Sequence, residues 1–132
     1  MREILFRGKL KAENGELKKG DWVYGDFVTL IDGKEKHLHI YGKGEVKAET
    51  IGQFTGLTDK NGKKIFEGDI IEWFLPEVSE YPSLAYIEYD ESSFAWRVCW
   101  QEYDPDWLEG LNKEYISVIG NIHDNHELLE NP

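Results

Sequence analysis

The sequence has little cysteine and no long hydrophobic run. Cys99 is the only cysteine among the 132 residues, so an internal disulfide framework is excluded. No apolar run approaches the roughly 20 residues that a membrane-spanning helix needs. The first ten residues, MREILFRGKL, also lack the apolar segment of a signal peptide. We therefore expect a cytoplasmic protein with no membrane partner.

Basic residues are scarce in the second half of the chain. Arg97 and Lys113 are the only lysine or arginine residues in 66–132, against sixteen acidic residues. Because lysine and arginine supply most of the affinity for phosphates, direct binding of nucleic acid is disfavoured. The acidic half then has two interpretations. It is either a solvated face that keeps the protein soluble, or a docking face for a basic host or phage protein. Mimicry of DNA toward a host DNA-binding protein is one form of the second interpretation.

The sequence also lacks the common catalytic signatures, namely a Ser-His-Asp order, a phosphate loop and a dinucleotide fingerprint. We expect no cofactor. An alternative is a metal-dependent enzyme or metal-binding protein that uses nearby carboxylates and four histidines: His37, His39, His123 and His126. Each histidine pair lacks a third ligand in the sequence, which a closed metal site requires.

Short β-rich runs separated by turn residues fill most of the chain. Strands are predicted at residues 4–10, 21–31, 37–41, 46–54, 70–74, 84–89, 94–100 and 115–119. Short helical turns are predicted at 105–109, with Asp104 as N-cap, and at 127–130. This pattern favours an all-β fold with little helix: a single domain over 1–132, forming a partly open β-barrel or sandwich built from hairpins.

Residues 52–69, GQFTGLTDKNGKKIFEGD, combine several turn signals. Asn61-Gly62 predicts a type I′ hairpin turn, in which both central residues have positive φ. A second turn is expected before the strand at 70–74. The structural motif consists of Gly52, Gly56, Asp59, Asn61, Gly62, Gly68 and Asp69.

This motif resembles the signature of the YopX family of phage and prophage proteins. The N-terminal run 2–8, followed by WVYGD at 22–26, and the run VIGNIHDNHELL at 118–129 also fit that family in the same order. The resemblance covers nearly the whole chain, except residues 75–113. It implies a mostly β domain from mobile genetic elements of bacteria, and it brings no catalytic residues.

An aromatic and acidic stretch near residue 105 is the candidate for partner contact. Its members are Tyr103, Asp104, Asp106 and Trp107. Tryptophan and tyrosine dominate the binding energy of protein interfaces. Trp107 is therefore either an exposed anchor or a side chain folded back on the sheet. Together these features favour a non-enzymatic accessory protein that acts through protein–protein contacts. Pairing of sheet edges between subunits would make it a homo-oligomer.

Overall fold

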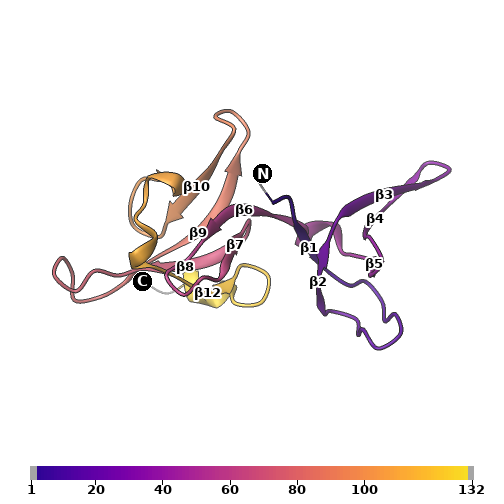
Figure 1. Cartoon of the computed structure of the whole chain (residues 1–132), viewed down its shortest axis with the longest axis horizontal. Coiled ribbons are helices and arrows are strands. Elements are labelled where there is room, and N and C mark those ends of the chain that lie inside the picture. Colours follow the sequence, from indigo (N-terminus) through magenta and orange to yellow (C-terminus); the bar gives the residue numbers. More distant parts are fainter. Residues whose placement is uncertain (1–2, 131–132) are drawn as a thin grey trace. The chain divides into compact units, whose positions relative to one another are not determined.

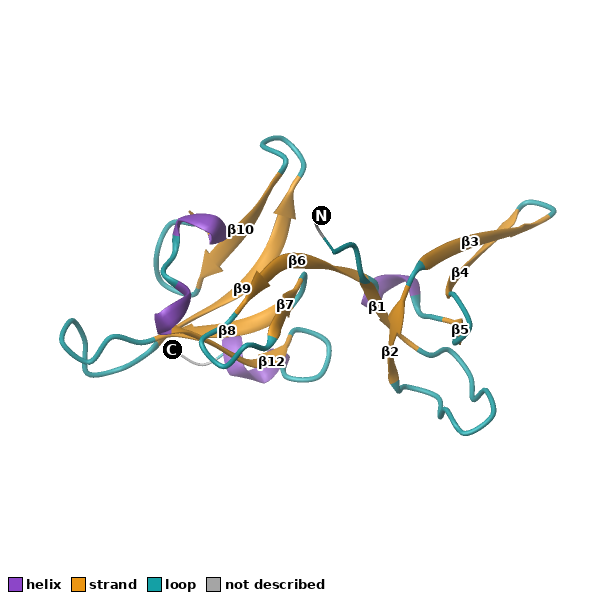
Figure 2. Ribbon diagram, in the orientation of Figure 1, coloured by secondary structure: helices purple, strands orange, loops and turns teal. Residues whose placement is uncertain are grey.

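The structure is a computed structural model that describes residues 3–130. Two compact units follow one another in the sequence, with the boundary between Phe54 and Thr55. Strands make up most of the regular structure, and the helical segments are short 3-10 turns (Figure 2). The predicted all-β class is confirmed, because antiparallel strands, several joined by hairpins, form open sheets over the described part of the chain. Among residues 3–130, no helix is both long and apolar enough to cross a membrane.

The first unit contains small antiparallel sheets, drawn in indigo and purple in Figure 1. Its elements are β1 (Phe6–Lys9), β2 (Trp22–Gly25), β3 (Phe27–Asp32), β4 (Glu35–Ile40), β5 (Gly44–Glu45), η1 (Ala48–Thr50) and the start of β6 (Gly52–Thr58). Strand β1 lies between β2 and β6, and β3, β4 and β5 form a separate sheet in that order. The buried core of this unit is Leu10, Val23, Ile40 and Val46.

Two long strands predicted in the first unit are interrupted. The strand expected at 21–31 breaks at Asp26, next to Gly25, which has φ 155° and whose added Cβ would lie 3.1 Å from Ile40 Cγ2. Because glycine has no Cβ, Gly25 tolerates both this φ and the close approach to Ile40, and the chain can leave β2 and enter a different sheet. The strand expected at 46–54 forms only at its end, as the start of β6, because residues 48–50 form the turn η1, where the Thr50 hydroxyl donates to the Lys47 carbonyl at 2.6 Å.

The second unit is built on a five-stranded antiparallel sheet in the order β11-β10-β9-β8-β12. Its elements after β6 are β7 (Lys64–Phe66), β8 (Asp69–Trp73), β9 (Ser83–Asp90), β10 (Ala95–Trp100), β11 (Asp106–Trp107), η2 (Leu108–Gly110), η3 (Lys113–Tyr115), β12 (Ile116–Asn121) and η4 (His126–Leu129). Alternate residues of these strands point into one apolar core, formed by Ile65, Ile71, Ala85, Ile87, Val98, Leu108 and Ile116. Burial of each such Ile or Leu side chain stabilises the folded state by about 1.5–3 kcal/mol, and this burial holds the sheet's face to the segments that cover it.

Two local predictions in this unit are wrong. The helical turn expected at 105–109 is instead strand β11 followed by η2, because Trp107 pairs with Arg97 and Leu108 is buried in the core. Phe94, predicted as the first residue of the strand at 94–100, does not belong to β10. It lies in the turn before that strand with φ 52° and is 82% exposed.

The hairpin of the central motif forms where it was predicted, but with a different turn. Gly62 has φ 79°, whereas Asn61 does not have positive φ, so the turn is not type I′. The buried carboxylate of Asp59 organises the loop instead. Its Oδ1 accepts hydrogen bonds from the backbone N–H groups of Asn61 at 2.8 Å and Lys63 at 2.9 Å. A loop with a single left-handed residue is therefore sufficient.

Candidate functional site

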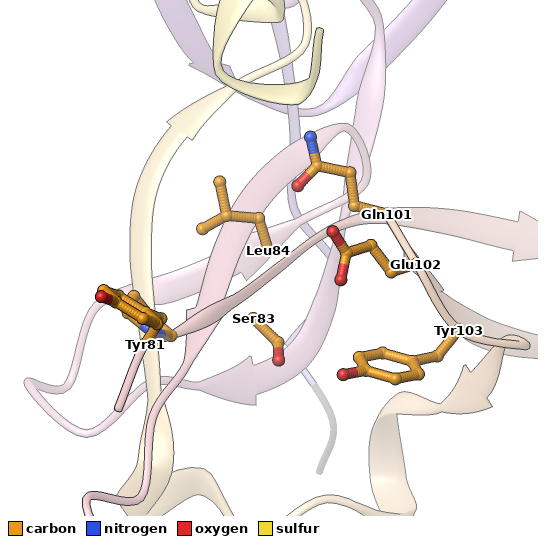
Figure 3. A pocket seen from close by; sticks show the side chains of 7 residues that line it. Tyr81, Ser83, Leu84, Gln101, Glu102 and Tyr103 are labelled. Atoms are coloured by element: carbon orange, nitrogen blue, oxygen red, sulfur yellow. The ribbon is translucent and has the colours of Figure 1, made fainter. Parts of the chain in front are cut away.

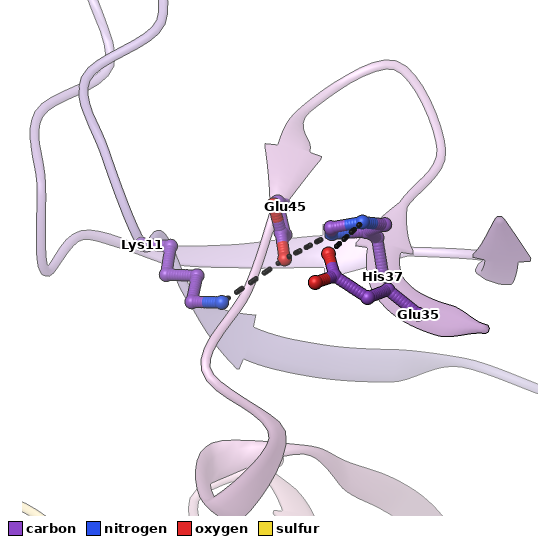
Figure 4. Close-up of polar contacts among 4 residues, drawn as sticks. All are labelled: Lys11, Glu35, His37 and Glu45. Atoms are coloured by element: carbon purple, nitrogen blue, oxygen red, sulfur yellow. Dashed lines mark hydrogen bonds and ion pairs between the residues drawn. The ribbon is translucent and has the colours of Figure 1, made fainter. Parts of the chain in front are cut away.

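The four candidate metal-ligating histidines lie in pairs in different units. In the first unit, His37 lies between two carboxylates: its Nδ1 is 3.2 Å from Glu45 Oε2 and its Nε2 is 3.6 Å from Glu35 Oε2 (Figure 4). Lys11 Nζ also contacts Glu45 Oε2 at 3.1 Å. Hydrogen bonds from His37 and Lys11 lower the pKa of Glu45. The cluster is thus a network of polar contacts across the β4–β5 pair, with an ion pair between Lys11 and Glu45.

The second histidine pair is also engaged locally. His126 Nε2 lies 3.4 Å from Glu130 Oε1, one helical turn later. The neighbouring Asp124 Oδ2 accepts a hydrogen bond from Asn121 Nδ2 at 3.1 Å. Within residues 3–130, no group of three or more His, Cys, Asp or Glu side chains is arranged to hold a metal ion.

Cys99 belongs to a polar cluster on one face of the β9–β10 pair. Its Sγ lies 3.4 Å from Glu88 Oε2, and Glu88 also pairs with Arg97. Burial, followed by the hydrogen bond and charge of Glu88, raises the pKa of the Cys99 thiol. Since the thiolate is the reactive form, this environment disfavours a nucleophilic role.

Asp59 and Asp69 of the central motif accept hydrogen bonds from backbone N–H groups. Asp69 is 2% exposed, and its Oδ2 accepts a hydrogen bond from the Phe66 N–H at 2.7 Å across the turn at Gly68. Asp59 Oδ2 accepts from the Val118 N–H at 2.9 Å. These carboxylates hold two turns of the second unit through hydrogen bonds to backbone N–H groups.

The second unit has a groove of about 590 Å³ near the ends of β8 and β10, which we call the aromatic groove. It is lined by the rings of Trp73, Trp100, Tyr103 and Tyr115 together with Val78 and Leu111. The rings of Trp73 and Tyr115 meet edge to face, with centroids 5.8 Å apart. Val78 and Tyr103 are 68% and 66% exposed, so this apolar surface is open to solvent.

A second hollow of about 530 Å³ adjoins the aromatic groove and shares Ser83 and Tyr103 with it. Figure 3 shows its side chains, with Tyr81 and Ser83 coming from the start of β9 and the preceding loop, and Gln101 to Tyr103 from the segment after β10. Gln101 is fixed, because its Nε2 donates to the Leu129 carbonyl at 2.8 Å. Glu102 and Tyr103 therefore project from an anchored segment.

The structure brings most of the predicted partner-contact residues to this surface. Tyr103 and Asp106 line the aromatic groove, and Asp104 is exposed between them. Asp106 Oδ2 accepts a hydrogen bond from Trp100 Nε1 at 2.7 Å, which fixes one indole of the groove. Trp107 is 43% exposed and lies in β11, outside the groove lining.

Sequence reasoning missed Trp73, Val78, Leu111 and Tyr115. Trp73 ends a strand, and the other three lie in loops or short turns far apart in the sequence. An aromatic residue at the last position of a strand, followed by a loop with Pro76 and Pro82, is the signal that would have pointed to this edge.

Comparison with known proteins shows a matching family model and a similar solved structure. A family model described as "YopX protein" matches residues 9–130. The chain is also similar to a solved structure described as protein EF1440 from Enterococcus faecalis, with 25% sequence identity and a TM-score of 0.50, over 98% of this chain and 99% of the other. No curated protein matches.

Proposed function

This chain belongs to the YopX protein family, and we propose that it is a non-enzymatic phage or prophage accessory protein that acts through protein–protein contacts and self-assembly. The observation that carries the proposal is the aromatic groove. The exposed side chains of Tyr103 and Val78 gather there with the half-buried rings of Trp73, Trp100 and Tyr115, beside the carboxylate of Asp106. Contiguous exposed apolar surface with a polar rim is typical of interaction sites.

The groove has the anatomy of a binding hot spot. Trp73 and Trp100 are half-buried, so their rings are held in place, while Tyr103 and Val78 stand in solvent at the edge. Anchored aromatic side chains contribute contact area at low entropic cost, and they dominate interface energetics. A partner side chain inserted between these rings would be desolvated on several sides.

The charge around the groove selects the partner. Residues 66–132 contain sixteen acidic and two basic residues, and Glu102, Asp104 and Asp106 lie on or beside the groove. Complementary charge speeds association and disfavours acidic partners. Aromatic rings next to carboxylates also suit lysine and arginine, whose charged heads stack on rings. We therefore propose that the groove takes a basic segment of a host or phage protein.

The test is binding of a fluorescein-labelled peptide of alternating lysine and alanine, followed by fluorescence anisotropy. A peptide of alternating glutamate and alanine is the control ligand. Binding of the basic peptide is expected at low salt, with progressive loss as salt rises. The variant Tyr103→Ala is expected to bind about tenfold more weakly, equivalent to about 1.4 kcal/mol.

The matched control is Phe94→Ala, which removes an aromatic ring that is 82% exposed in the turn between β9 and β10, outside the groove lining. This variant is expected to bind like the parent protein. Equal loss in Tyr103→Ala and Phe94→Ala, or equal binding of both peptides, would contradict the proposal. The double variant Glu102→Gln/Asp104→Asn separates charge from ring contact, and its binding is expected to depend less on salt.

A further inference from the structure

Strand β3 is an edge strand of the first unit. The sheet order β3-β4-β5 places it at one side, with β4 as its neighbour. Five of its six residues are exposed, including Phe27 at 36%, Leu30 at 49% and Ile31 at 69%. An edge strand with apolar side chains in solvent is a template for pairing with another strand.

The hydrogen-bond phase of the hairpin identifies which backbone groups face outward. The Tyr41 N–H donates to the Asp26 carbonyl at 2.8 Å, and residues 26 and 41 continue the register in which Phe27 opposes Ile40. Directly opposed residues alternate between hydrogen-bonded and non-hydrogen-bonded pairs. The even-numbered residues of β3 therefore bond to β4, and the N–H and C=O groups of Phe27, Thr29 and Ile31 point toward the free edge.

The composition of β3 does not protect this edge. Residues 27–31 read FVTLI and contain no charge and no proline, the residues that usually prevent edge pairing. The charged residues lie at the ends instead. Asp26 precedes the strand, Asp32 ends it, and Lys34 lies in the turn that follows.

We propose that β3 pairs with β3 of a second copy of this chain, antiparallel about a two-fold axis at Leu30. In this register, the outward groups of Thr29 and Ile31 bond across the axis, and Leu30 meets Leu30 of the other copy. Asp26 then lies beside the turn that carries Lys34, so opposite charges meet at both ends. A register centred on Thr29 would place Asp26 opposite Asp32 twice, and like charges directly opposed are destabilising.

This inference rests on the self-assembly part of the proposed function and names the surface that performs it. It is independent of the aromatic groove, which lies in the other unit. Failure of β3 pairing is therefore distinguishable from failure of partner binding, because basic-peptide binding by the same variants can be measured separately.

The first experiment measures molar mass by light scattering after size exclusion, over a wide range of protein concentration. The parent protein is expected at twice the 15.4 kDa of one chain. The variant Ile31→Lys places a charge on the free edge and is expected at the mass of one chain. Tyr41→Lys is the matched control, since Tyr41 is 73% exposed in the same unit but lies outside β3, and it should retain the double mass.

Circular dichroism and basic-peptide binding are to be measured on Ile31→Lys to check that this variant is folded. A parent protein with the mass of one chain at every concentration would overturn both the inference and self-assembly. A folded Ile31→Lys variant that keeps the double mass would overturn the β3 inference alone.

A second experiment tests the register by oxidation in a Cys99→Ser chain, which has no other cysteine. Leu30→Cys would place two thiols directly opposite in a non-hydrogen-bonded pair, within the distance that a disulfide spans. Thr29→Cys, by contrast, places them two residues out of step. A covalent dimer is expected to form faster for Leu30→Cys. Equal or faster cross-linking of Thr29→Cys, or none in either variant, would overturn the proposed register.

Discussion

The Asp59 carboxylate accepts a hydrogen bond from the backbone N–H of Val118, 59 residues later, at an oxygen-to-nitrogen distance of 2.9 Å. Its other oxygen accepts from Asn61 and Lys63 inside its own hairpin. One buried side chain, 2% exposed, thus joins the loop of the central motif to strand β12. The most distinctive stretch of the sequence is therefore a structural clasp of the second unit.

Replacement of Asp59 by Asn is expected to destabilise the protein by about 1–3 kcal/mol, because the amide cannot accept hydrogen bonds at both ends and leaves a buried donor unpaired. The measurement is urea unfolding followed by tryptophan fluorescence. Glu91→Gln is the matched control, since it removes one negative charge from an exposed turn residue. Its urea-unfolding midpoint should equal that of the parent protein within experimental error. Equal midpoints for the two variants would show that the clasp contributes nothing.

The same carboxylate predicts a pH dependence of stability. Burial, the largest single influence, raises the pKa of Asp59, but the N–H groups of Val118, Lys63 and Asn61 and the charge of Lys63 together lower it below its ordinary value of 3.8. A carboxyl with a lowered pKa in the folded state stabilises the fold fully above its unfolded-state pKa. That contribution is lost as pH falls through the folded-state value.

The free-energy difference between the parent protein and Asp59→Asn is therefore expected to be constant near neutral pH and to shrink below about pH 4. Urea unfolding at a series of pH values measures it. A free-energy difference that grows as the pH is lowered would contradict the conclusion that folding lowers the pKa of Asp59.

Gly120 is required by its contact with Asn125. A Cβ at Gly120 would lie 2.6 Å from Asn125 Oδ1 and 3.0 Å from Asn125 Cβ, at the irregularity where β12 shifts its register against β8. Gly120→Ala is expected to cost about 1–3 kcal/mol in the free energy of unfolding, as overpacking does. Gly110→Ala is the control, because an added Cβ there meets no atom within 4 Å. It should be neutral or stabilise by about 0.4–1 kcal/mol. Equal effects of the two substitutions would refute the steric explanation.

The single-domain prediction for residues 1–132 is testable by calorimetry. Strand β6 runs through the boundary between the units: the Phe54 N–H donates to the Leu5 carbonyl in the first, and the Thr55 hydroxyl donates to the Ile65 carbonyl in the second. One unfolding transition is expected, and Gly120→Ala should lower its temperature.

Gly8→Ala is the counterpart of Gly120→Ala in the first unit, since its added Cβ would lie 2.9 Å from Val46 Cβ. It should lower the temperature of the same transition. Two separate transitions, each sensitive to one of the variants, would show that the units are independent domains.

The strands were predictable because their signals are local. The strand predicted at 94–100 matches β10 except at Phe94. Trp96, Val98 and Trp100 alternate with less apolar residues, as side chains that point to opposite faces of a strand do. The turn at Asn61 was mispredicted because the Asp59 side-chain carboxylate accepts hydrogen bonds from the backbone N–H groups of Asn61 and Lys63, and in this turn Asn61 does not need positive φ. The turn at 105–109 was mispredicted because the burial of Leu108 and the pairing of Trp107 with β10 outweigh the local preference of Pro105.

The candidate site was only partly predictable. Tyr103 and Asp106 were identified because aromatic and acidic residues adjoin in the sequence. Trp73, Trp100 and Tyr115 were not identified. They come from the ends of three separate elements, and in the sequence alone they cannot be distinguished from core residues. Proximity that arises only from strand order leaves no local pattern in a single sequence.

The most direct test of the central claim is affinity purification of the tagged protein from bacterial lysate, at low and high salt, beside the groove variant Tyr103→Ala and the control Phe94→Ala. We expect that a protein with a basic surface is retained by the parent and by Phe94→Ala, released by salt and lost from Tyr103→Ala. If added DNA also displaces it, the acidic face acts as a DNA mimic toward a DNA-binding protein. Retention of the same proteins by the parent and by Tyr103→Ala would contradict the assignment of the aromatic groove as the binding surface.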